Sequence, residues 1–306
     1  MYIPLEIFVG EVSGESDDAK LSIPMIIVHG GAGNWKDERI SPGIDHVKRA
    51  AEIGFRTLLG GGSSLDAAEA CTLYMESSGF LNAGRGARKN DHDEAELDAM
   101  IVDGENLRFG SVGSIRGIEN PISLARYIME ETDYVFFVGE GAMIKYKEMI
   151  EKGYRKETSF GVVSKPFNNG TADTVGCVVV DGNGVMAATS STGGIGGKPL
   201  GRVGDSPVFG SGAFANKVAS ASATGYGEHI MRVTLTRNVV NSIENGMDVQ
   251  SAAEKGIEFL ADMTGSEAGV IAADSKGNWG RATNAKAMPT AVISSELSNV
   301  QTFYQP

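Results

Sequence analysis

Cysteine is scarce in this sequence, with only Cys71 and Cys177 among 306 residues. Both stand in apolar segments, which favours reduced, buried thiols over a disulfide. No stretch approaches the roughly 18 consecutive apolar residues of a membrane-spanning helix. The first twenty residues lack the basic start, apolar core and small-residue cleavage site of a secretory signal. These absences predict a cytoplasmic protein that does not associate with a membrane.

Positive charge is also in short supply. Lysine and arginine number 27 against 39 aspartate and glutamate residues, which gives a formal net charge of −12. Nucleic-acid phosphates would be repelled, so we expect no nucleic-acid partner. The glycine-rich loops lack the strand–loop–helix setting and the Gly-Lys-Ser/Thr ending of a phosphate cradle. This argues against nucleotide binding as well.

Helix and strand periodicities cover most of the chain before residue 153. The apolar segment 25–30 is typical of a buried strand and runs into a Gly-Gly-Ala-Gly loop. Ser63 or Ser64 is a suitable N-cap, and Asn120 before Pro121 marks another helix start. The patterns predict helices over 42–59, 64–77, from 121 onward and 140–152, and strands over 97–103, 107–113 and 134–138.

The second half of the chain begins with a change of pattern. Residues 153–173 have weak periodicity and many turn-forming residues, whereas two apolar segments then flank the turn 181–184, a strong hairpin signal. Further patterns predict helices over 226–245 and 248–263, a hairpin within 269–283 and a strand over 288–294. Because strands come in adjacent pairs and helices in runs, we expect an α+β fold of antiparallel sheets layered with helices.

The first hairpin brings hydroxyl groups together. With 181–184 as the loop, paired residue numbers sum to about 365, so Thr174 would lie across from Ser191 and beside Thr192. Threonine is common in strands, so this pattern alone favours an ordinary strand. A hydroxyl nucleophile needs a base, and none of the four histidines is adjacent in sequence. Cleavage before Thr174 would supply one, an α-amine with a pKa of about 7.7–8.0.

Several motifs resemble a single family, the plant-type L-asparaginases and isoaspartyl peptidases, which are N-terminal-nucleophile hydrolases. VHGGAG, FLNAGRGA and ELDAMIVDG are similar to that family's α-subunit. GTADTVGCVVVDGNG, ATSSTGG, GRVGDSPVFGSGAFA and SATGYGE are similar to its β-subunit. The resemblance spans about residues 25 to 295, and the motifs occur in the family's order.

The resemblance implies roles for the hydroxyls near the hairpin. Thr174 would be the nucleophile, freed by self-cleavage of the Asp173–Thr174 bond, and its new α-amine would be the base. Thr192, in STGG, would hold that amine or hydroxyl in place. The residues before that bond, Ala172 and Asp173, lack the histidine that some relatives have in an HDTVG sequence, so Asp173 could assist cleavage or be a bystander. Its part in cleavage is therefore left open.

The resemblance also implies a substrate-binding set. Arg202 would bind the substrate α-carboxylate and Asp205 the α-ammonium, whereas the alternative for this pair is a solvated ion pair in a turn. A guanidinium suits a planar carboxylate because it donates two parallel hydrogen bonds. Thr224 and Gly225 would form an oxyanion hole, although they could equally cap a helix. Asn82 would line the site from the α-subunit.

A structural sodium ion is a further implication of the resemblance. In that family a loop before the Asn-Ala-Gly motif binds sodium through main-chain carbonyl groups. Carbonyl ligands leave almost no signature in sequence, so an ordinary loop at the end of a helix is the alternative. The corresponding positions here are Met75, Glu76, Ser78, Leu81, Ala83 and Arg85.

The resemblance implies a four-layer αββα sandwich in which residues 1–173 form the α-subunit and 174–306 the β-subunit. It further implies a dimer of αβ heterodimers that hydrolyses a small-molecule or dipeptide amide without an organic cofactor. Glycosylasparaginase shares the fold and nucleophile and is one alternative. An unprocessed, inactive homologue that acts as a binding protein is another.

Overall fold

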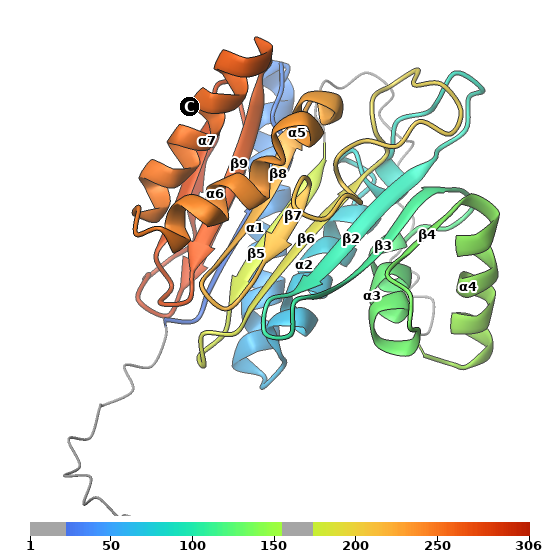
Figure 1. Cartoon of the computed structure of the whole chain (residues 1–306), viewed down its shortest axis with the longest axis horizontal. Coiled ribbons are helices and arrows are strands. Elements are labelled where there is room, and N and C mark those ends of the chain that lie inside the picture. Colours follow the sequence, from blue (N-terminus) through green and yellow to red (C-terminus); the bar gives the residue numbers. More distant parts are fainter. Residues whose placement is uncertain (1–22, 155–173) are drawn as a thin grey trace, which may run out of the picture.

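The computed structural model describes residues 23–154 and 174–306, which form two β-sheets with helices packed against them (Figure 1). The helices are α1 (Asp37–Leu59), α2 (Ser64–Ser77), α3 (Pro121–Glu131), α4 (Gly139–Glu151), α5 (Gly227–Val233), α6 (Leu235–Glu244) and α7 (Val249–Thr264), with a 3-10 turn at Gly84–Gly86. The strands are β1 (Met25–His29), β2 (Leu97–Asp103), β3 (Arg108–Ile115), β4 (Phe136–Val138), β5 (Val175–Val180), β6 (Met186–Thr192), β7 (Ala213–Ala215), β8 (Ala219–Gly225), β9 (Ala268–Asp274), β10 (Trp279–Thr283), β11 (Thr290–Ser294) and β12 (Gln301–Phe303).

The larger sheet has the strand order β12-β11-β1-β5-β6-β2-β3-β4, and the smaller one has the order β10-β9-β8-β7. All neighbouring strands are antiparallel except β3 and β4. The segments before and after residues 155–173 thus share one sheet, because β5 pairs with β1 and β6 pairs with β2.

Side-chain alternation along the central strands explains why both faces of the large sheet are covered. On β1, Ile26 and Val28 pack into a core shared with α1 and α2. Met25 and Ile27 point to the opposite face and pack against residues of the small sheet. A strand that is buried on both faces reads as an uninterrupted apolar run, as β1 and β5 do.

Helices cover the two outer faces (Figure 1). Helices α1 and α2 contact β1, β5, β6 and β11, and α3 packs on β2 and β3. Helices α6 and α7 pack on the small sheet, where they enclose a separate apolar core. Within 23–154 and 174–306, no helix has both the length and the apolarity needed to cross a bilayer.

Most elements lie where the sequence predicts them, with three differences. The helix predicted over 226–245 is divided because Thr234 adopts a left-handed conformation with φ 45°. Helix α1 begins at Asp37, five residues early, and contains Pro42. Strands β7, β8 and β12 were not predicted, since two of them have only three residues each. Cys71 and Cys177 are buried free thiols, as predicted.

The predicted register of the first hairpin is wrong by one residue. Val175, not Thr174, lies across from Ser191, and Gly176 lies across from Ser190. The residue numbers of each cross-strand pair therefore sum to 366. The turn between the paired strands spans 181–185, one residue more than the predicted 181–184. A one-residue shift sends a side chain to the opposite face of the sheet. Thr174 consequently lies next to Thr192 and away from the Ser191 side chain.

Gly176 on β5 is required by close packing between the sheets. A methyl group at this position would overlap the Ser222 hydroxyl and the His29 ring. We expect Gly176→Ala to lower the melting temperature by several degrees, because overpacking a rigid core costs about 1–3 kcal/mol. Gly182→Ala is the matched control, since nothing lies within 4 Å of its added methyl group. Equal thermal shifts for the two variants would contradict this reading.

Candidate active site

A small pocket lies where β5 begins and β6 and β8 end. Thr174 directly precedes β5, Thr192 is the last residue of β6, and Gly225 is the last residue of β8. The 193–205 loop closes the pocket from one side. The lining residues are Thr174, Thr192, Gly194, Ile195, Arg202, Gly204, Asp205, Gly225 and Gly227. Residues from distant parts of the segment 174–227 thus meet at one place.

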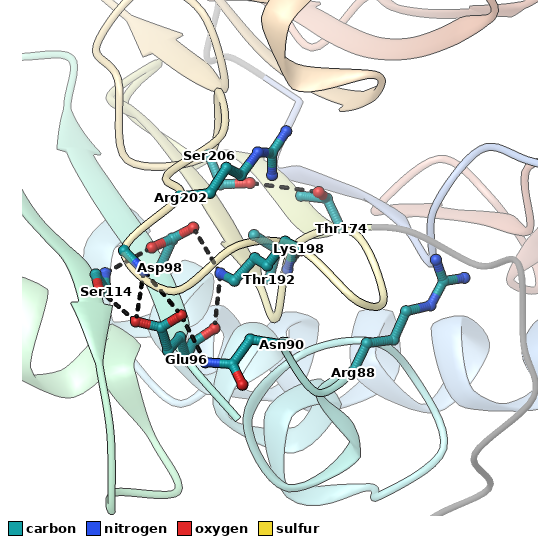
Figure 2. Close-up of polar contacts among 12 residues, drawn as sticks. Arg88, Asn90, Glu96, Asp98, Ser114, Thr174, Thr192, Lys198, Arg202 and Ser206 are labelled. Carbon is teal, nitrogen blue, oxygen red and sulfur yellow. Dashed lines mark hydrogen bonds and ion pairs between the residues drawn. The ribbon is translucent and has the colours of Figure 1, made fainter. Parts of the chain in front are cut away.

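Thr174 is 3% exposed, and its hydroxyl oxygen lies 3.3 Å from that of Ser206 (Figure 2). The Thr192 hydroxyl accepts a hydrogen bond from the Gly194 N–H at 2.9 Å. Thr192 therefore fixes the start of the 193–205 loop as well as lining the pocket beside Thr174. Sequence reasoning gave Ser206 no role, although it follows directly after Asp205.

Ser191 is turned away from this pocket. Its hydroxyl donates to Glu76 Oε1 at 2.6 Å, on the helix-covered side of the sheet. Glu76 also accepts hydrogen bonds from the Asn120 side chain and the Ile122 N–H. Burial raises the pKa of Glu76 to about 8, although these hydrogen bonds act in the opposite direction. The predicted gathering of three hydroxyls thus reduces to Thr174 and Thr192, joined by Ser206.

Arg202 and Asp205 both line the pocket, but the carboxylate that binds Arg202 is that of Glu228. Arg202 donates from Nε and Nη2 to the two Glu228 oxygens at 2.9 and 2.7 Å. This hydrogen bonding lowers the pKa of Glu228. The solvated turn considered as the alternative does not describe this pair, because Asp205 is 3% exposed and the Arg202 side chain 15%. The contact with Glu228 could not be predicted from the sequence, because Glu228 lies 26 residues after Arg202.

Glycines around Arg202 permit this close arrangement. A Cβ at Gly204 would lie 2.8 Å from Arg202 Nη1. A Cβ at Gly227 would lie 2.9 Å from Asp205 Oδ1 and 3.0 Å from Arg202 Nη2. Any larger residue at either position would displace the guanidinium or the carboxylate. The Nη1 and Nη2 atoms are thereby flanked by bare backbone.

Thr224 and Gly225 lie at the end of β8. The Thr224 hydroxyl accepts a hydrogen bond from the Ala32 N–H at 3.1 Å, which links β8 to the glycine-rich loop after β1. Gly225 has a φ of 146°, and an added Cβ would crowd Glu267 and Ala268. Neither residue caps α5, whose N-cap is Tyr226. Gly225 lines the pocket, whereas Thr224 is fully buried behind it.

Asn82 supports the pocket from behind. Its side-chain nitrogen donates to the Gly194 carbonyl at 2.9 Å, and its side-chain oxygen accepts from the Arg88 N–H at 2.8 Å. Its backbone carbonyl accepts from the Gly193 N–H. Asn82 is 4% exposed and is not among the pocket-lining residues. It therefore holds the Gly193–Gly194 turn in place.

The segment considered for sodium comprises the last turn of α2, with Met75 and Glu76, and the compact loop that follows it. The carbonyls of Met75, Leu81 and Ala83 already accept hydrogen bonds from within the loop, and each retains a second lone pair. The side chain of Arg85 donates to Glu119, outside the loop. Ser78 satisfies the end of α2. Oxygen donors of this kind suit a hard cation, so the loop is chemically compatible with one.

Among the residues described, no three His, Cys, Asp or Glu side chains are grouped so that they could hold an ion. His29 lies on β1 across from Gly176, and its Nε2 hydrogen-bonds with the Ser222 hydroxyl at 3.1 Å. Burial lowers the pKa of His29 to about 3. Asp173, the other half of the expected cleavage site, lies outside the described residues.

Comparison with known proteins is consistent across the chain. A family model described as "Asparaginase" matches residues 22–159 and 144–302. The chain is 36% identical over 297 residues to an isoaspartyl peptidase/L-asparaginase of Xenopus laevis, covering 92% of this chain and 96% of that protein. It is 39% identical over 293 residues to a plant-type L-asparaginase of Pyrococcus horikoshii, covering 88% and 95%. The chain therefore belongs to the asparaginase family whose model spans nearly all of it.

Proposed function

We propose that this protein hydrolyses the side-chain amide of L-asparagine and of β-aspartyl dipeptides and releases L-aspartate. The observation that carries the proposal is the pocket itself, which brings together Thr174, Thr192, Arg202, Asp205 and Gly225. A hydroxyl, a guanidinium and a carboxylate around one small space match a substrate that carries an amide, a carboxylate and an ammonium group. The name of the Xenopus laevis relative contains both activities, and that of the Pyrococcus horikoshii relative contains L-asparaginase.

Self-cleavage before Thr174 is the first step of the proposed mechanism. It divides the chain into an α-subunit, 1–173, and a β-subunit, 174–306, and it exposes the α-amine of Thr174. An external base is needed otherwise, and His29 is a poor one because its pKa is about 3. A free α-amine titrates near pH 7.7–8.0, so it can take up the hydroxyl proton at about neutral pH.

Substrate hydrolysis follows by acyl transfer. Thr174 Oγ1 attacks the side-chain carbonyl carbon, the C–N bond breaks, and the leaving nitrogen takes a proton and departs as ammonia or an amine. Water then hydrolyses the aspartyl ester and frees the hydroxyl. The Thr224 hydroxyl and the Gly225 N–H would stabilise the oxyanion, an effect worth about 10²–10³ in rate per donor. Thr192 positions the nucleophile that it adjoins.

Arg202 and Asp205 form the proposed substrate clamp. Glu228 occupies the Nε side of the guanidinium, which leaves the Nη1–Nη2 edge between Gly204 and Gly227 for the substrate α-carboxylate. Asp205 would receive the α-ammonium. Asn82 would not touch the substrate. It would position the Gly193–Gly194 turn at the pocket through its hydrogen bond to the Gly194 carbonyl.

The layering of helices and sheets supports the αββα sandwich of N-terminal-nucleophile hydrolases as the fold. We include in the proposal a dimer of αβ heterodimers, a cytoplasmic location and a structural sodium ion at the loop from Met75 to Arg85. No step of the reaction passes through that ion. An unprocessed binding protein is the alternative class, and a denaturing gel separates it, because fragments of 173 and 133 residues arise only by cleavage.

One shared site predicts competition between the two substrates. L-asparagine and β-Asp-Leu present the same carboxylate, ammonium and carbonyl groups and differ only in the leaving group. We expect each to inhibit turnover of the other competitively, with an inhibition constant equal to its own KM where chemistry is slow. Steady-state assays of both, with a glycosylated asparagine as third substrate, measure this. Non-competitive inhibition would refute a single site, and preference for the glycosylated substrate would favour glycosylasparaginase.

A further inference from the structure

A buried network of charged residues, Glu96, Asp98 and Lys198, lies near Arg202 of the proposed clamp (Figure 2). Lys198, in the 193–205 loop, is 3% exposed, and its ammonium lies between Glu96 and Asp98 of the α-subunit segment. It donates to the Glu96 carbonyl at 3.1 Å and lies 3.9 Å from Asp98 Oδ2. Burying a lysine ammonium costs free energy unless an opposite charge is close to it, so Lys198 depends on a neighbouring carboxylate.

Asp98 carries the negative charge that Lys198 balances. It is fully buried, and its Oδ1 accepts a hydrogen bond from the Ser114 N–H at 2.8 Å. Burial raises its pKa, whereas the charges of Lys198 and Arg202 act in the opposite direction. Arg202 is thus close enough to interact electrostatically with the Asp98 carboxylate. Without Lys198, the nearest cation for Asp98 would be the guanidinium that the clamp needs.

Glu96 anchors the same loop through a separate set of contacts. Its carboxylate accepts from the Asn90 side chain, from the Ser114 hydroxyl and from the Gly201 N–H, one residue before Arg202. These three donors satisfy its hydrogen bonds, whereas the charge of Lys198 acts on the Glu96 carboxylate as well as on that of Asp98. Residues 198–201 of the loop are therefore held to the segment 90–114 by both main-chain and charged contacts.

Lys198 also lies against the pocket wall. A Cβ at Gly194 would be 3.0 Å from Lys198 Nζ and 3.3 Å from Arg202 Nη1. Gly194 and Arg202 line the pocket, whereas Lys198 does not. The Gly194 backbone therefore separates the Lys198 ammonium from the place proposed for the substrate α-carboxylate. It can act on substrate only through Arg202 and the loop.

We propose that Lys198 is a positioning residue for substrate binding, which neutralises Asp98 and thereby keeps Arg202 turned toward the substrate carboxylate. This inference rests on the proposed function of the clamp. Its distinctive consequence is electrostatic, because removing Lys198 alone leaves an unbalanced buried carboxylate beside Arg202. Removing both charges leaves a neutral pair, and the Arg202 guanidinium keeps its contact with Glu228.

The test compares Lys198→Met with the double variant Asp98→Asn/Lys198→Met. We expect the single variant to raise KM for L-asparagine at least about tenfold, with kcat changed less than about threefold. The double variant should return KM to within about threefold of the parent. Lys217→Met is the matched control, because it removes a lysine from an exposed pair with Glu105 and should change neither constant.

Binding of the product L-aspartate, measured by calorimetry, separates this inference from the function itself. A parent protein that does not hydrolyse L-asparagine refutes the proposed function. An active parent whose single variant has an unchanged KM and L-aspartate Kd refutes the role of Lys198. If Lys198→Met fails to fold, the double variant decides. Near-parental L-aspartate affinity then supports charge balance, and affinity tenfold weaker overturns it.

Discussion

Thr174→Ala is expected to leave the 306-residue chain uncut and to lower hydrolysis of L-asparagine at least about 10³-fold. The variant loses the hydroxyl that both reactions need. In the proposed mechanism, self-cleavage requires it for the N-to-O acyl shift, and hydrolysis requires it for attack on the substrate. A denaturing gel and a steady-state assay of the same preparation measure the two losses together.

Thr174→Ser is the matched control because it keeps the hydroxyl and removes only a methyl group. It should yield the two fragments slowly and retain measurable turnover. Ser206→Ala adds a second reading, since Ser206 is the hydroxyl 3.3 Å from Thr174. Recovery of two normal fragments from Thr174→Ala would exclude Thr174 as the residue that performs cleavage.

The fold could be predicted to a large extent from local patterns. The hairpin β5–β6 was predicted because the turn-forming residues 181–184 separate two apolar runs, and β1 because Met25–Val28 are four successive apolar residues. The register was missed by one residue, since apolarity on both faces of β5 removes the alternation that normally fixes it. The helix break at Thr234 had no signal either, because threonine is not a residue that favours a left-handed conformation.

The candidate site was likewise predictable only in part. Thr174, Thr192, Arg202, Asp205 and Gly225 were identified through motifs, and the structure brings them to one pocket, while their chemical roles stay predictions. Their partners were missed because they depend on tertiary contacts. Glu228 is 26 residues from Arg202, and Asp98 is 100 residues from Lys198. Helix and strand periodicities relate only residues that are close in sequence. The contacts of Lys198 with Asp98 and of Arg202 with Glu228 are therefore visible only in the folded structure.

The linkage of the substrate provides the sharpest test of the clamp. In β-Asp-Leu the α-carboxylate is free, whereas in α-Asp-Leu the peptide bond consumes it, so Arg202 would find no anionic partner. We expect the α-linked isomer to be hydrolysed at least about 10³-fold more slowly, because a site built around a charged hydrogen bond rejects a ligand that lacks it.

Arg202→Lys should reveal which group reads that difference. Lysine keeps the positive charge but loses the two-pronged geometry held by Glu228, at a cost of about 1.5–3 kcal/mol, or roughly ten- to hundredfold in kcat/KM for β-Asp-Leu. Self-cleavage should persist, because an intramolecular reaction needs no grip on a substrate carboxylate. Comparable rates for the α- and β-linked dipeptides in the parent would show that the α-carboxylate is not read at all. Failure of Arg202→Lys to cleave itself would instead make Arg202 a residue that shapes the site before any substrate arrives.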